Sequence, residues 1–113
     1  MNERTVMQRL ELLEYHQSLL MEMMTFSSDE FNKLIITKKL SKREVETFSS
    51  FCEKLSIEMQ EQKAEGFVYF HPLFNEFKSI LPRHIQAREM IEACLQQGLF
   101  TPLMAEFKKY LKS

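Results

Sequence analysis

Glycine, proline and tryptophan are scarce in this chain of 113 residues, and its charges nearly cancel. Two glycines and three prolines leave little material for the many tight turns of an all-β fold. Fifteen basic and sixteen acidic residues give a formal net charge of −1, so the basic excess typical of nucleic-acid-binding proteins is missing. Asp29 is the single aspartate, and the other acidic residues are glutamate, which helices tolerate better. These absences favour a helical protein.

Long apolar runs and export signals are missing as well. No uninterrupted apolar stretch approaches the ~18 residues of a membrane span, and the start has no signal-peptide pattern. Cys52 and Cys94 are the only cysteines, too few for a disulfide scaffold. We therefore expect a cytoplasmic protein without membrane contact. The two thiols are expected to be reduced and packed, with a metal pair or a redox switch as alternatives.

Two neighbouring apolar rows mark the predicted first helix, over residues 3–24. The first row repeats at alternating steps of four and three, and it comprises Val6, Leu10, Leu13, Gln17, Leu20 and Met24. The second comprises Leu12, His16, Leu19 and Met23. Together they form a face wider than one partner helix covers. We therefore predict that residues 1–24 form an oligomerisation helix, whose interface residues are Val6, Leu10, Leu13, His16, Gln17, Leu20 and Met24.

The histidine, glutamine and methionine side chains on this face each allow more than one interpretation. His16 is expected to be packed or interfacial, with a pH-sensitive contact or a metal ligand near a symmetry axis as alternatives. Gln17 could fix the register between helices or lie half in water at the rim. Five of the eight methionines fall within the first 24 residues, which suits core filling or self-association, or an adaptable groove for a partner helix.

Five further helices are predicted, over residues 29–38, 42–65, 72–81, 83–97 and 102–112. Ser27 with Glu30, and Ser41 with Glu44, have the spacing of capping boxes. Gly66 and Gly98 are expected to end the third and fifth helices. Thr101 is expected to cap the sixth.

The predicted core takes its side chains from helical apolar spacings. Residues 67–70, the one β-like run, are expected to form an extended connector packed on that core. The inward residues are Phe31, Leu34, Ile35, Val45, Phe48, Cys52, Leu55, Met59, Leu73, Phe74, Phe77, Ile80, Leu103, Phe107, Tyr110 and Leu111. The fold class is therefore all-α: one domain over residues 1–113, of about six helices, two of them long, with short loops and no sheet.

A basic cluster surrounds the second capping box and comprises Lys38, Lys39, Lys42 and Arg43. It resembles the reading end of a helix-turn-helix, but Glu44, Glu46 and Glu53 follow at once and would face phosphates. Solvated charge at helix ends is the first interpretation, and an acidic protein partner or nucleic acid are the alternatives.

Motifs for chemistry are missing. Two glycines cannot form a phosphate-binding loop, and no pair of histidines shares a helix turn. We therefore predict no catalytic, cofactor-binding or metal-binding residues and no enzyme activity. An active site assembled from distant helices, for example from His71, His84 and a glutamate, is the remaining alternative.

Three segments together resemble the YhaI-like family of uncharacterised small proteins from Bacillus-type bacteria. They are residues 40–44 (LSKRE), 62–68 (QKAEGFV) and 96–100 (QQGLF), the last followed by Leu103, Met104 and Phe107. Residues 10–15 (LELLEY) fit as well, although an acidic cap is expected in relatives at His71-Pro72. The resemblance implies a multihelical fold assembled from identical subunits, and it implies no activity.

The sequence thus predicts a non-enzymatic homo-oligomer, a dimer or trimer, that serves as a protein-interaction or regulatory module with a further protein partner. A nucleic-acid-associated regulator that uses the basic cluster is the alternative.

Overall fold

A computed structural model describes residues 2–25, 28–82 and 84–111. Within these ranges the chain forms six α-helices and no strand, which confirms the all-α prediction. The helices are α1 (Glu3–Met23), α2 (Glu30–Thr37), α3 (Lys42–Ala64), α4 (His71–Ser79), α5 (Ala87–Gln97) and α6 (Thr101–Lys108). As predicted, two of them, α1 and α3, are long.

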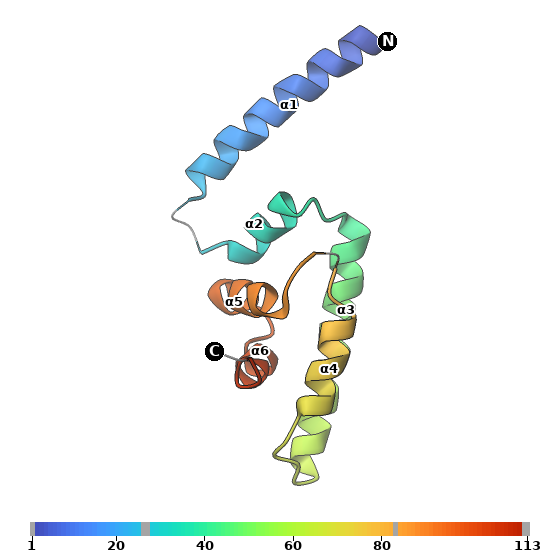
Figure 1. Cartoon of the computed structure of the whole chain (residues 1–113), viewed down its shortest axis with the longest axis vertical. Coiled ribbons are helices and arrows are strands. Elements are labelled where there is room, and N and C mark those ends of the chain that lie inside the picture. Colours follow the sequence, from blue (N-terminus) through green and yellow to red (C-terminus); the bar gives the residue numbers. More distant parts are fainter. Residues whose placement is uncertain (1, 26–27, 83, 112–113) are drawn as a thin grey trace.

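The helices form a packed body, α2–α6, and one helix outside it. In Figure 1, α1 points away from the body, while α4 returns along α3 and α5 lies between α2 and α6. The molecule is therefore elongated, with principal extents of 62 × 29 × 22 Å. No helix of the described part is both long and apolar enough to cross a membrane.

The core lies entirely within the body. Phe77 of α4 is fully buried, and its ring centroid lies 5.0 Å from that of Phe107 and 6.1 Å from that of Phe48. Three helices that are distant in sequence therefore meet at this ring. Eleven of the predicted core residues are buried, and the other five, Ile35, Val45, Ile80, Tyr110 and Leu111, are half-buried against them.

Helix α5 adds a share of the core of which the sequence analysis had singled out only Cys94. Met90, Ile91, Ala93 and Cys94 are all buried, as is Met104 of α6. In contrast, α1 contributes no buried residue.

The predicted helix ends are largely confirmed. Ser41 Oγ accepts a hydrogen bond from the Glu44 N–H at 3.1 Å, and Glu44 Oε1 accepts one from the Ser41 N–H at 3.2 Å, which completes the capping box. Gly66 has a φ of +98° and Gly98 a φ of +75°, the left-handed conformation that suits glycine at a helix end. Ser27, of the other predicted capping box, lies outside the described residues.

Four predicted helix starts differ from the structure, those of α2, α4 and α6 by one residue and that of α5 by more. Helix α5 begins at Ala87, four residues later than predicted, because His84 is left-handed, with a φ of +61°. The Gln86 N–H then donates to Glu89 Oε1 at 3.3 Å. Thr101 is the first residue of α6 rather than its cap, since Phe100, with a φ of +50°, precedes the helix.

The connector at residues 67–70 forms neither helix nor strand, and only its last residue joins the core. Phe67, Val68 and Tyr69 are exposed, whereas Phe70 is buried and its N–H donates to the Tyr110 hydroxyl at 2.9 Å. The prediction that the whole run packs on the core was therefore wrong. One inward anchor is enough to hold the chain between α3 and α4.

Replacing Phe77 by alanine tests the proposed centre of the core. Because the side chain is fully buried among other rings, we expect Phe77→Ala to lower the free energy of unfolding by about 3–5 kcal/mol. Val68→Ala, at an exposed position, should change it by less than about 0.5 kcal/mol. Urea unfolding followed by circular dichroism measures both, and equal effects would contradict the assignment.

Candidate interaction surfaces

Helix α1 carries most of the apolar surface that the molecule leaves in solvent. Nine of the thirteen large hydrophobic side chains exposed among the described residues lie on it. Leu13 is 62% exposed and Leu20 57%, whereas every aliphatic side chain at the centre of the body is below 10%. Contiguous exposed apolar surface is common at protein–protein interaction sites, so the apolar face of α1 is a candidate interaction surface.

The helix is well formed at its start. Asn2 Oδ1 accepts hydrogen bonds from the Thr5 N–H and the Thr5 hydroxyl, both at 2.9 Å, so the cap is made by a side chain. Twenty-one residues give a length of roughly 30 Å. Most helical stability in proteins comes from packing of an amphipathic face, and the described part of the chain buries no residue of α1.

All seven residues of the predicted interface lie on α1 or at its end. Val6, Leu10, Leu13, His16, Gln17 and Leu20 are exposed, and Met24 is half-buried. The ring of His16 lies 5.9 Å from that of its neighbour Tyr15. The helix therefore presents the predicted residues together to solvent.

The basic cluster lies at the corner between α2 and α3, where glutamates neutralise part of it. Lys38 Nζ lies 3.7 Å from Glu89 Oε2, and Lys42 Nζ lies 3.8 Å from Glu46 Oε1. Lys39 and Arg43 complete the corner, and Lys39 is left-handed, with a φ of +56°. The four basic residues are thus neighbours, but their field is weaker than their sequence suggests.

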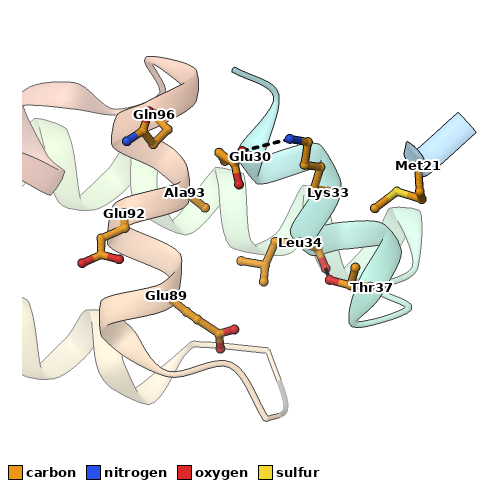
Figure 2. Close-up of a pocket in the computed structure, with 9 residues that line it drawn as sticks. All are labelled: Met21, Glu30, Lys33, Leu34, Thr37, Glu89, Glu92, Ala93 and Gln96. Carbon is orange, nitrogen blue, oxygen red and sulfur yellow. Dashed lines mark hydrogen bonds and ion pairs between the residues drawn. The ribbon is translucent and has the colours of Figure 1, made fainter. Parts of the chain in front are cut away.

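A groove between α2 and α5 was not anticipated from the sequence. It has a volume of about 620 Å³, and its walls face each other in Figure 2. Lys33 bridges Glu30 at 3.0 Å and donates to the Thr25 carbonyl at 3.2 Å. The residues that line it are Met21, Glu30, Lys33, Leu34, Thr37, Glu89, Glu92, Ala93 and Gln96. Only tertiary structure brings these segments together, so no local pattern could reveal the groove.

The two cysteines are free thiols buried in the core. Burial raises the pKa of Cys94 to about 12. Burial also raises the pKa of Cys52, and neighbouring Cys94 raises it further. Both thiols are therefore protonated at neutral pH, which makes them poor nucleophiles and confirms that they are packed as predicted.

The structure does not bring the two candidate histidines together. His71 begins α4, among the rings of Tyr69, Phe74 and Tyr110, whereas His84 follows the other end of that helix. The nine residues of α4, His71 included, span roughly 13 Å, so the two histidines lie at opposite ends of this helix. Within the described ranges, no group of three or more His, Cys, Asp or Glu side chains is arranged to hold a metal ion.

A family model described as a protein of unknown function, DUF1878, matches residues 2–112. The chain belongs to this family. Since the DUF1878 description assigns no activity, the surfaces of the molecule are the guide to its role.

The pH dependence of the free energy of unfolding tests the burial of the two thiols. Unperturbed thiols ionise near pH 9.0, but Cys94 in the fold ionises only near 12, so in this interval the unfolded chain loses its proton first. The free energy of unfolding should therefore fall as the pH rises above about 9, by up to ~1.4 kcal/mol per pH unit from this thiol. Cys94→Ala should show a shallower fall in urea titrations, and equal slopes would contradict the account.

Proposed function

We propose that the chain is a non-enzymatic, cytoplasmic module that assembles from two or three copies of itself through α1. The surface of α2–α6 is then left for a regulatory or adaptor contact with another protein. One observation carries the proposal: the part of the chain that the structure describes leaves the apolar face of α1 uncovered.

The energetics of that face favour self-association. Burying a leucine or valine side chain contributes roughly 1.5–3 kcal/mol, and every copy brings the same row to the interface. The opposing cost of association is about 4–15 kcal/mol, so several such side chains from each copy are needed to exceed it. The first row provides Val6, Leu10, Leu13 and Leu20, all exposed in the single chain.

We also propose that the chain resembles the YhaI-like proteins of Bacillus-type bacteria. The support is the order and spacing of residues 40–44, 62–68 and 96–100. In the fold these segments form a helix cap and two helix ends, so they record a common architecture.

A nucleic-acid role for the basic cluster is the alternative proposal. Proximity of the four basic side chains supports it, whereas the ion pairs to Glu89 and Glu46 weaken it. The one aspartate and seven glutamates within residues 29–65 would also have to approach a phosphate backbone. We therefore favour a protein as the external partner.

The mass of the purified protein in solution tests the assembly. Light scattering at tens of micromolar should give two or three times the chain mass of 13.5 kDa. Leu13→Glu puts a charge into the apolar row and should weaken association by more than about 100-fold. Ser18→Glu adds the same charge outside the two apolar rows and should leave the mass unchanged. A monomeric wild-type protein would rule out the proposal.

Binding to duplex DNA at low salt separates the two proposals. As a protein-interaction module, the chain should show no binding that depends steeply on salt, and the double change Lys39→Glu, Arg43→Glu should alter nothing in a fluorescence titration. Binding that weakens with salt and disappears in this variant would favour the nucleic-acid role instead.

A further inference from the structure

The first row of α1 has the spacing of a coiled-coil seam. In a heptad written a to g, Leu10, Gln17 and Met24 occupy the a positions, and Val6, Leu13 and Leu20 occupy the d positions. Two charged residues then flank the seam directly, Arg9 at g and Glu14 at e. The repeat of the first row also places Glu3 at an a position, at the very start of the helix. The second row would be a poorer seam, because its repeat places Arg9 and His16 further inside the helix.

Neither flanking charge has a partner within its own chain. Arg9 and Glu14 are five positions apart, a spacing at which helical side chains do not face each other. No residue three or four positions from Arg9 is acidic, and none at those spacings from Glu14 is basic. Across the described ranges, neither takes part in an ion pair. Both charges are available to a second helix.

A parallel arrangement in register satisfies both charges. In such a pair, a g residue faces the e residue five positions further along the other helix. Arg9 of one copy therefore faces Glu14 of the second copy, and symmetry makes the same contact again. The a positions also face each other, so two Gln17 side chains meet and can exchange amide hydrogen bonds.

An antiparallel arrangement places Glu14 against a like charge and leaves the Gln17 amide without a hydrogen-bond partner. Its layers pair a with d, and its flanks pair e with e and g with g. With the two rows fully overlapped, Glu14 then faces Glu14 of the second copy. Gln17 faces Leu13, so its amide is buried without a partner, which costs roughly 1–3 kcal/mol.

We propose that α1 pairs with α1 of a second copy in a parallel, in-register coiled coil, with Arg9–Glu14 contacts on its flanks and Gln17 as its polar layer. This rests on the proposed self-assembly and adds its orientation. The bodies then lie at the same end of the coiled coil. Because Met21 of α1 lines the α2–α5 groove, the grooves of the copies are gathered around one axis.

Charge reversal tests the flanking contacts. Arg9→Glu and Glu14→Arg each turn both attractive contacts into repulsive ones, so each should raise the dissociation constant roughly five- to thirtyfold. The double variant restores opposite charges and should return close to the wild-type value. A mixture of the two single variants should form mixed complexes in preference to either alone. Arg4→Glu, at an outer b position, is the matched control and should have little effect. Sedimentation equilibrium measures all five proteins.

The outcomes separate this proposal from the one it rests on. If the wild-type protein assembles but neither single variant is weakened, the Arg9–Glu14 contacts do not form and the proposal fails. If the wild-type protein is a monomer, self-assembly itself fails.

A crosslink gives a second measurement of orientation. Glu3 occupies an a position at the start of α1, so Glu3→Cys should form a disulfide between copies under mild oxidation. Antiparallel helices would hold these residues roughly 30 Å apart, and absence of the crosslink would overturn the proposal. Cys52 and Cys94 are fully buried and do not compete.

Discussion

The uncovered apolar face of α1 is the constraint on which the rest of the account depends. A helix of this length gains little from its own hydrogen bonds in water, so its persistence requires burial of side chains. The chain places none of its own core against it. We propose that another surface covers the leucine, methionine and valine side chains of this face, and an identical helix from a second copy is the surface we favour.

The body of the molecule can supply the stability that α1 lacks. Phe77 lies where α3, α4 and α6 meet, and its ring contacts the rings of Phe48 and Phe107. Helix α5 adds the buried side chains of Met90 and Ile91 to this core. The hydrogen bond from Lys33 to the Thr25 carbonyl links this body to the segment after α1. The chain thus combines a self-sufficient core with a projecting arm, an arrangement that suits assembly and leaves the body surface for other contacts.

Much of this architecture follows from local sequence signals. The capping box at Ser41 and the glycines at 66 and 98 mark helix ends because their chemistry acts within a few residues. The apolar spacing identified most of the core. The features that local sequence patterns did not predict depend on tertiary contacts. They are the late start of α5 after the left-handed His84, and the exposure of Val68 in a β-like run. The groove between α2 and α5 is the third. The candidate interface residues of α1 were predicted together because one helix contains them all.

Amide hydrogen exchange along residues 6–20 is the most direct test of the central claim. If α1 is covered by a second copy, its amides should exchange slowly at high protein concentration and faster on dilution, while the amides of α3 and α4 remain protected throughout. Fast exchange of α1 at every concentration, with a protected body, would show that the helix has no partner of its own kind and would contradict the account.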